Sequence, residues 1–174
     1  MPKVCKICGK KPYANLSICF LCWKSREKEK RLEKLRKKNE RRLGSKKYQK
    51  SETKLWHRKC WKLMSEWVRR SGSDWRGMVV CYTCGNFLPW KESHAGHHFH
   101  GKLDFDERNL RVQDAACNTY RGGMLNVYAK KLIQENGLAW YEQLERDAAQ
   151  HPGYRLDELK TIYAQLQEKL ESLK

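Results

Sequence analysis

The chain has 174 residues, with 37 Lys and Arg against 20 Asp and Glu, a formal net charge of +17 and a pI of about 9.6. This length suits one medium-sized domain or a small domain with appendages. A charge excess of this size favours a polyanionic partner. Because no stretch reads as a transmembrane or signal segment, we expect no membrane partner and a cytoplasmic protein with reduced cysteines.

Four of the eight cysteines form a complete metal-binding set in residues 1–23. Their spacing is C-x2-C-x10-C-x2-C, and the four are Cys5, Cys8, Cys19 and Cys22. Four thiolates satisfy tetrahedral Zn2+ and exclude water, so a site of this kind is structural. A redox dithiol would need a thioredoxin-like βαβ context, which this segment lacks. We therefore predict an N-terminal zinc finger.

Residues 24–54 are strongly basic, with 15 Lys and Arg against 5 Asp and Glu. Good helix formers dominate up to Leu43, and Gly44-Ser45 predicts the end of the helix. A merely solvated helix is one interpretation. The one-sided excess favours contacts with DNA phosphates, which give affinity without base specificity. The candidate DNA-binding residues of this helical linker are Lys34, Arg36, Lys37, Lys38, Arg41, Arg42, Lys46 and Lys47.

Residues 53–70 carry large apolar side chains at helical spacing, which predicts a helix with one buried face. Cys60 and His57 lie on adjacent turns of this helix. The two could bind a metal together, but a packed thiol is the more typical role of a free cysteine on an apolar face. The helix opens the predicted core domain, residues 55–128.

Another cysteine pair lies in a predicted β-hairpin, whose strands are residues 78–81 and 87–90. A zinc-anchored ββα unit takes two ligands from such a hairpin and two from the start of the following helix. One of the latter is a cysteine, but three residues before it stands Asp114, a legitimate yet less common zinc ligand. The predicted second zinc site is Cys81, Cys84, Asp114 and Cys117. The alternative is that packing alone holds this fold together.

Between the two halves of this site, His97 is followed by Asn109 and then by Asn118, directly after a cysteine. This order resembles the HNH, or ββα-metal, nucleases. In those enzymes a strand-borne His acts as general base, and one divalent metal stabilises the scissile phosphate. The segments AGHH, DFDERNLRVQ, ACN and LNVYAKKLI resemble, more closely still, the NinG/Rap family of lambda-like phages. The resemblance covers nearly the whole chain and is most specific in residues 81–128.

The NinG/Rap resemblance implies a structure-specific DNA endonuclease that acts on branched double-stranded recombination intermediates, such as Holliday junctions and D-loops, in the bacterial host cytoplasm. It implies Mg2+ or Mn2+ as the catalytic metal. His97 matches the general base, and Asn109 matches the amide that orients this base or its loop. Asn118 matches a metal ligand, and Arg121 stands where a basic residue could hold a phosphate. His94 replaces an acidic residue of the family and could ligate through nitrogen.

Four positions depart from these patterns. Gly96 stands where many HNH sites have Asp, although the NinG/Rap resemblance allows a glycine there. Tyr120 replaces a His, Met124 an Asn, and Asp114 a zinc Cys. These departures motivate an alternative function, a non-catalytic protein that binds branched DNA on a degenerate HNH scaffold. An RNA- or ribosome-associated zinc protein is a third hypothesis, supported only by charge and zinc motifs.

Two more histidines follow the candidate base in the segment HAGHHFH. On a strand, alternate residues share a face, so His98 and His100 would point together and away from His97. They would then be phosphate contacts at the surface or hydrogen-bonded structural histidines. A metal pair with strand spacing is the less favoured interpretation.

Residues 129–174 read as helices, with Gly137 between two of them. In the last helix, apolar residues recur every three or four positions from Leu156 to Leu173, the a/d rhythm of a coiled coil. This helix is too short for a stable isolated coil, so packing onto the same chain and homodimerisation both stay open. The expected fold is α+β and mostly helical. It comprises an N-terminal four-Cys knuckle, a long basic helix, a small zinc-anchored ββα-metal core and C-terminal helices.

Overall fold

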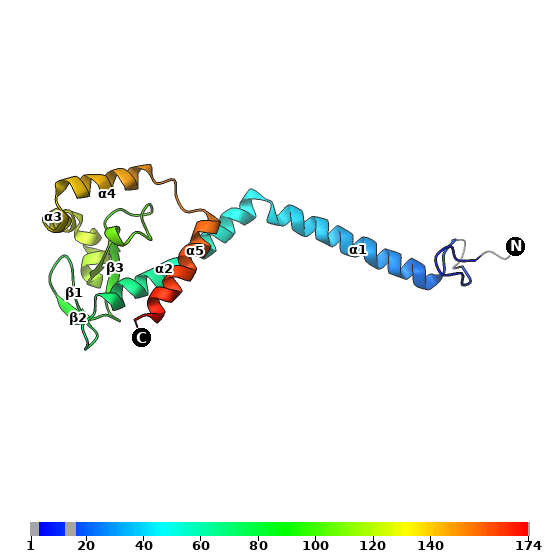
Figure 1. Ribbon diagram of the computed structural model, residues 1–174, viewed down its shortest axis with the longest axis horizontal. Coiled ribbons are helices and arrows are strands. Elements are labelled where there is room, and N and C mark those ends of the chain that lie inside the picture. The colour runs from blue at the N-terminus through cyan, green and yellow to red at the C-terminus, as the bar shows by residue number, and fades with distance from the viewer. Residues whose placement is uncertain (1–3, 13–16, 174) are drawn as a thin grey trace. The chain divides into compact units, whose positions relative to one another are not determined.

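The computed structural model describes residues 4–12 and 17–173, and the chain divides into two units, Met1–Lys50 and Ser51–Lys174 (Figure 1). As expected, the fold is α+β and mostly helical. The helices are α1 (Phe20–Leu43), α2 (Lys46–Ser71), α3 (Leu125–Asn136), α4 (Leu138–Gln150) and α5 (Leu156–Glu171). The strands are β1 (Met78–Val80), β2 (Phe87–Pro89), β3 (His94–His97) and β4 (Leu110–Gln113). Within the described ranges, no helix is long and apolar enough to cross a membrane.

Helix α1 is a solvated helix without a single buried residue. Its acidic residues pair along the helix, Glu27 with Lys30, and Glu33 with Arg36 and Lys37. Pairs spaced three or four residues apart stabilise an exposed helix by roughly 0.2–0.5 kcal/mol each. The helix ends at Leu43, with Gly44 as its C-cap, where the sequence predicts the stop.

Helix α2 is the helix on which the core of the second unit packs. Its Cys60, Met64 and Val68 are buried in a core cluster that also takes residues from β1, β2, β3, β4 and α5. The Cys60 Sγ donates to the backbone oxygen of Leu159 at 3.1 Å. Burial raises the pKa of this thiol. Cys60 is thus a packed and hydrogen-bonded thiol, the role that the sequence favoured.

The a/d stripe of α5 is buried within its own chain. Leu159, Leu166 and Leu170 are buried, and α5 lies alongside α2 (Figure 1). Leu159 and Leu166 belong to the core cluster of α2. The stripe therefore anchors α5 to the second unit, one of the two roles that the sequence left open for it, and homodimerisation stays a prediction.

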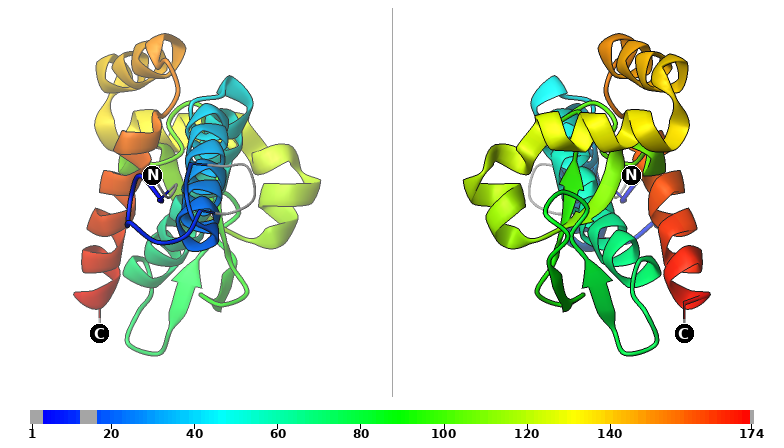
Figure 2. Two further views of the ribbon diagram at one scale, coloured as in Figure 1. Left: turned by 90° about the vertical axis from the view of Figure 1, so that its right-hand side faces the viewer. Right: turned by 90° about the vertical axis from the view of Figure 1, so that its left-hand side faces the viewer.

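Strands β1 and β2 form an antiparallel hairpin, with Val79 opposite Leu88 and Val80 opposite Phe87. The first pair is buried and the second is exposed, because successive side chains of a strand face opposite sides. Figure 2 shows this hairpin at the edge of the second unit away from α3 and α4.

Strands β3 and β4 form a second antiparallel pair, from His94 opposite Gln113 to His97 opposite Leu110. The chain enters β4 through a short 3-10 turn, η1 (Glu107–Asn109), and leaves it through a π-helical turn, η2 (Ala116–Tyr120). A further 3-10 turn, η3 (Gly122–Met124), leads into α3. This order places η2 against β3 and β4, where the expected ββα unit would have its helix.

Helices α3 and α4 form a smaller cluster of their own. Tyr128 and Leu132 from α3 pack with Leu144 and Ala148 from α4, and Leu103 from the loop after β3 completes the cluster. Gly137 separates the two helices with a φ of 90°, a conformation that favours glycine. The predicted break between the helices is confirmed.

Candidate functional site

The first unit contains a four-cysteine cluster, Cys5, Cys8, Cys19 and Cys22, whose sulfurs all lie within 4.8 Å of one another. A tetrahedral zinc with Zn–S bonds of about 2.3 Å needs sulfurs roughly 3.8 Å apart, and the Cys8 and Cys19 sulfurs are 3.4 Å apart. Although burial raises it, backbone N–H groups lower the pKa of Cys5 to about 6. Hydrogen bonds to the Cys8 and Cys19 sulfurs raise that of Cys22 to about 12. Crowded thiols of this kind could hold a metal such as zinc.

The second unit contains a three-cysteine cluster, Cys81, Cys84 and Cys117, again with all sulfurs within 4.8 Å. Burial raises the pKa of Cys81, but hydrogen bonds from the Asp114 and Cys84 N–H groups bring it down to about 7. The cluster joins the end of β1 and its turn to the first residues of η2. It too could hold a metal such as zinc, with one position of a tetrahedral shell left for another ligand.

Asp114, the expected fourth ligand, is not part of this cluster. Its carboxylate accepts hydrogen bonds from the Asn86 side chain and from the backbone N–H of Ala116, both at 2.7 Å. These bonds, first that from Asn86, lower the pKa of Asp114, and the charges of Arg121 and His94 lower it further. Asp114 therefore caps the start of η2 and ties it to the hairpin turn. The structure brings together three of the four predicted ligands.

His94 and Asn118, the two expected ligands of a catalytic metal, lie side by side. The Asn118 Nδ2 is 3.3 Å from the His94 Nδ1, and the contact is exposed to solvent. His94 comes from the first position of β3 and Asn118 from the middle of η2, directly after Cys117 of the three-cysteine cluster. A metal on that cluster would therefore also fix the position of Asn118 relative to the strands.

His97, the expected general base, ends β3 and packs on α2. Its imidazole stacks on the indole of Trp61, with ring centroids 4.2 Å apart and planes at 19°. Its Nε2 lies 3.4 Å from the Oδ1 of Asp104. Burial lowers the pKa of His97 to about 4; Asp104 raises it, while His100 and His57 lower it further.

Sequence reasoning missed the carboxylate that serves two histidines in this region. Asp104 is buried, its Oδ2 lies 2.9 Å from the His57 Nε2, and its Oδ1 accepts from the Gly101 N–H at 3.0 Å. The sequence relates His57 only to Cys60 on the next helical turn, because its contact with Asp104 spans 47 residues of sequence. The carboxylate thus bridges His57 on α2 and His97 on β3.

Successive side chains of β3 point to opposite faces of the strand, and this places His97 away from the exposed His94–Asn118 pair. His94 faces η2, whereas His97 lies three residues later and faces α2, on the opposite side of the strand. At about 3.3 Å of rise per residue, three residues span roughly 10 Å along the strand. The structure brings the two metal-ligand candidates together and places the base candidate on the other face.

Asn109 is fully buried and holds the loop that follows His97. Its Oδ1 accepts from the Phe99 N–H at 2.7 Å, and its Nδ2 donates to the backbone oxygens of Phe99 and Leu103, both at 2.9 Å. The backbone oxygen of Asn109 also accepts from the His98 N–H. All hydrogen-bonding capacity of the side chain faces the protein. Asn109 therefore holds the loop that follows His97, and its role in catalysis stays a prediction.

The orientation expected for His100 is wrong. Strand β3 ends at His97, so alternation does not continue beyond it, and the His100 ring lies 5.3 Å from that of His97. His98 is buried, and its Nε2 is 2.8 Å from the hydroxyl of Tyr141. His98 is thus a hydrogen-bonded structural histidine, one of the two roles considered for it.

Gly96 has a steric reason to be glycine. A Cβ at this position would overlap the side-chain amide of Gln113, which is fully buried on the same face. That amide donates to the Thr83 hydroxyl at 3.1 Å and to the Gly123 oxygen at 2.8 Å. The space that a side chain at position 96 would occupy is therefore taken by a glutamine that ties β4 to the hairpin and to η3.

The structure also shows the surroundings of Tyr120 and Met124, two of the other departures. Tyr120 is 87% exposed, beside Arg121, which is exposed as well. Met124 has a φ of 49° and is the one non-glycine residue with positive φ among the described residues. Asn tolerates this left-handed conformation better than most residues do, so the Asn that the resemblance expects there would be the less strained choice.

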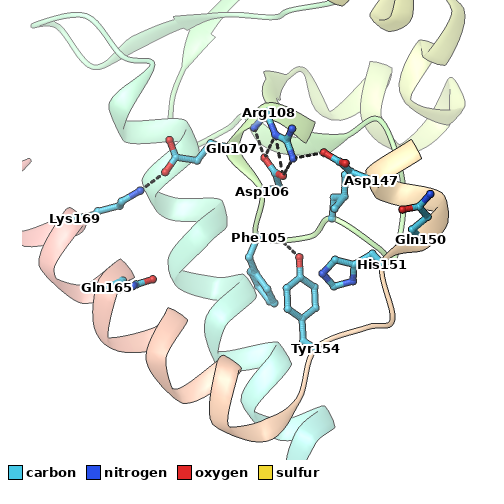
Figure 3. A pocket seen from close by; sticks show the side chains of 11 residues that line it. Phe105, Asp106, Glu107, Arg108, Asp147, Gln150, His151, Tyr154, Gln165 and Lys169 are labelled. Atoms are coloured by element: carbon cyan, nitrogen blue, oxygen red, sulfur yellow. Dashed lines mark hydrogen bonds and ion pairs between the residues drawn. The ribbon is translucent and has the colours of Figure 1, made fainter. Parts of the chain in front are cut away.

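A cavity of about 700 Å3 lies between α4, α5 and the loop before β4 (Figure 3). Its cations are already neutralised. Arg108 contacts Asp106 at 2.7 Å and Asp147 at 2.8 Å, and Lys169 pairs with Glu107. Since each of these cations faces a carboxylate, the cavity offers no unpaired cation for a phosphate.

The geometry of the candidate site can now be set beside known proteins. The family model of the bacteriophage lambda NinG protein matches residues 2–174. The chain belongs to the NinG family. Similar curated NinG proteins include those of Salmonella phage P22, 32% identical over 123 residues, and of Escherichia phage lambda, 30% identical over 123 residues. Each match covers 68% of this chain.

The chain spans 58% of the NinG protein of phage P22 and 57% of that of phage lambda. The NinG protein of Escherichia phage 933W gives the same picture, at 30% identity. No solved structure matches the chain. Family membership therefore rests on sequence, and the arrangement of the His94–Asn118 pair rests on the structure described above.

Proposed function

We propose that this NinG-family protein is a metal-dependent endonuclease that cuts branched DNA, such as Holliday junctions and D-loops. The observation that carries the proposal is the exposed His94–Asn118 pair, 3.3 Å apart, at the junction of an antiparallel strand pair and the helical turn that follows it. Phosphoryl transfer by one-metal nucleases needs such an open site, where a metal can meet both protein and phosphate.

The donor set of this pair suits Mn2+ better than Mg2+. Nδ1 of His94 is an imidazole nitrogen, and the Asn118 amide can supply a carbonyl oxygen. Mg2+ prefers oxygen ligands and keeps several waters, whereas imidazole favours transition metals. When bound, the metal would stabilise charge on the scissile phosphate and its leaving oxygen. Arg121, exposed close by, would hold a phosphate of the same strand.

His97 is the proposed general base. With its pKa lowered to about 4, the ring is neutral at neutral pH and so able to accept a proton. The buried Nε2 of His97 has no hydrogen bond and lies 3.4 Å from the Asp104 Oδ1, so a small approach of this carboxylate would hold the ring in the tautomer that leaves Nδ1 free. For His97 to act on a phosphate at the exposed pair, the end of β3 would have to turn toward η2.

One observation favours a second candidate function, the non-catalytic binding of branched DNA. His97 stacks on Trp61 and faces away from His94 and Asn118. If this arrangement persists on DNA, the metal pair would hold a phosphate without a base to activate water. The two candidates share the same DNA-binding parts and differ in cleavage alone.

Affinity for DNA would come mainly from the first unit. Residues 1–50 contain 18 Lys and Arg against 4 Asp and Glu, a net charge of +14 out of +17. The cations of α1 lie on a helix without buried residues and outnumber the glutamates that pair with some of them, so phosphates can approach this surface. Lys46 and Lys47 continue this basic surface into the start of α2. Such contacts give affinity that falls steeply with salt.

A four-way junction with labelled arms tests both candidates. We expect incision of the junction, but not of a linear duplex, in Mn2+, and a weaker reaction in Mg2+. His97→Ala should abolish incision and leave junction binding intact, while Asn118→Ala should shift the metal requirement to higher concentration. Tight binding without incision in either metal would favour the non-catalytic function. Cutting by His97→Ala at the wild-type rate would exclude His97 as the base.

A further inference from the structure

The hairpin of β1 and β2 presents an uncovered aromatic surface. Trp75, which precedes β1, is 92% exposed, and the cross-strand pair Val80 and Phe87 is 56% and 50% exposed. The other tryptophans of the second unit are at least half-covered by its two core clusters. Leaving a whole indole in water gives up the free energy of burying it, so this side chain contributes little to the stability of the fold.

Cations lie against these rings. The guanidinium carbon of Arg76 is 5.5 Å from the centre of the Trp75 ring and 5.8 Å from that of Phe87. Asp74 holds this guanidinium in place through contacts of 3.2 and 3.3 Å. On the neighbouring ring of Trp90, Arg69 and Arg70 take similar positions, at 5.5 and 5.9 Å. Rings beside the hairpin thus lie against guanidinium groups, that of Arg76 from the loop before β1 and those of Arg69 and Arg70 from the end of α2.

A cavity adjoins the exposed face of the hairpin. It has a volume of about 300 Å3, and its lining includes Val80, Phe87, Tyr82 and Arg111. The Arg111 guanidinium lies 5.4 Å from the centre of the Tyr82 ring. The lining of this cavity therefore includes two aromatic rings and a guanidinium, at a volume that admits one flat heterocycle.

We propose that this hairpin surface, Trp75, Arg76, Val80 and Phe87, binds unpaired nucleobases of a DNA strand. Aromatic rings stack on any base, and guanidinium planes stack on bases as well as on indoles. Two of the guanidiniums already face a carboxylate, Arg76 on Asp74 and Arg70 on Glu66 at 3.3 Å. Exposed rings with cations held beside them recognise the faces of bases, which phosphate contacts do not.

Residues outside this hairpin surface supply the positive charge that would attract a nucleic acid. Residues 1–50 carry a net charge of +14, which favours a nucleic acid over a protein partner. The turn of the hairpin carries Cys81 and Cys84, and the three-cysteine cluster connects it to Cys117, the neighbour of Asn118. A strand whose unpaired bases rest on the hairpin would thus lie on the same small scaffold as the candidate metal pair. The inference rests on the proposed function, because a D-loop is a branched DNA in which an unpaired strand meets a duplex.

The test compares binding of the full-length protein to a 20-nucleotide single strand and to the corresponding duplex, by fluorescence anisotropy without added divalent metal. We expect Trp75→Ala to weaken single-strand binding about ten-fold and duplex binding less than two-fold. Trp75→Phe, which keeps a ring, should retain most of the affinity. Leu138→Ala removes a side chain that is 57% exposed at the start of α4 and is the matched control, expected to change neither.

Salt dependence provides a second readout. Trp75→Ala should leave the slope of log affinity against log salt unchanged, because no phosphate contact is lost. The double variant Lys46→Ala/Lys47→Ala should reduce that slope on both DNAs. An equal loss on single strand and duplex for Trp75→Ala, no loss on the single strand, or an absence of DNA binding by the wild type would each overturn the inference. A wild type that binds DNA but never cuts it would contradict the endonuclease proposal. The ratio of single-strand to duplex affinity could still be measured for that protein and would still test the present inference.

Discussion

The imidazole of His97 lies nearly flat on the indole of Trp61, with 4.2 Å between ring centroids. This stack joins the end of β3 to α2 and removes most of the histidine from water. Because burial penalises the imidazolium, it is the main reason why the pKa of His97 falls to about 4. Measurable consequences for stability follow from this relationship and from its neighbours.

Stability should decrease on mild acidification because of His97. Its folded pKa of about 4 lies below the ordinary value of 6.5, so the unfolded chain binds more protons between these two pH values. The contribution is complete above pH 6.5 and is lost as the pH falls toward 4, by on the order of 3 kcal/mol. His97→Phe, which preserves the stack but does not titrate, should show a flatter curve.

Urea unfolding at a series of pH values, with zinc in constant excess, measures this difference. The comparison with His97→Phe cancels the titration of the cysteine clusters and of His98, whose pKa burial also lowers. Parallel stability curves for the two proteins between pH 4 and 6.5 would contradict the assignment.

Asn109→Ala should destabilise the second unit strongly. The substitution removes three buried hydrogen bonds and leaves the Phe99 N–H and two backbone oxygens without these partners. The expected loss is about 3 kcal/mol. Asn136→Ala is the control, since Asn136 is exposed and its side chain makes a single bond to Leu132 within its own helix. Denaturation midpoints that shift equally in both variants would argue against a buttressing role.

Gly96→Ala should destabilise through a collision with Gln113. The added Cβ has no room beside this buried amide. We expect a loss of roughly 1–3 kcal/mol, typical of overpacking. In the double variant Gly96→Ala/Gln113→Ala the collision is relieved, so the two effects should not add. Additive losses in thermal unfolding would show that the contact is not the cause.

Metal content should separate the two cysteine clusters. We expect two zinc ions per chain by elemental analysis, one for each cluster. Cys117→Ser should reduce the count to one. Asp114→Asn should leave it at two, because its carboxylate caps η2 instead of joining the sulfurs. A count that drops on Asp114→Asn as it does on Cys117→Ser would restore Asp114 as a ligand.

Much of the fold can be predicted from the sequence because its signals are local. The stop at Gly44, the hairpin around Cys84 and the break at Gly137 each follow from a few adjacent residues. Contacts distant in sequence are harder to predict. The contact between His57 and Asp104 depends on how α2 packs against the loop after β3. No sequence pattern in either segment predicts this contact.

In the candidate site too, local sequence signals could be interpreted, whereas contacts between distant residues could not be predicted. Spacing alone pairs the cysteines, whereas Asn109 and Asn118 stand out only through the resemblance to the NinG/Rap and HNH patterns. The orientation of His100 could not be predicted, because it depends on whether the strand continues past His97 or the chain turns there. Asp114 shows a different limit. A motif position gives the place of a residue in the chain but not which of two competing partners, metal or helix terminus, its carboxylate takes.

The π-helical turn η2 has a consequence for how this site can vary. Its 3.0 Å hydrogen bond from the Arg121 N–H to the Ala116 oxygen spans five residues, so the turn contains one residue more than an α-helical turn would. That extra residue changes the rotation of the chain about the axis of the turn. Cys117 can therefore face the other two cysteine sulfurs and Asn118 can face His94, while the apolar residues of α3 still point into the cluster that α3 forms with α4. Deleting Thr119 would keep every motif residue in the chain and yet rotate the ligand pair out of register with the helix behind it.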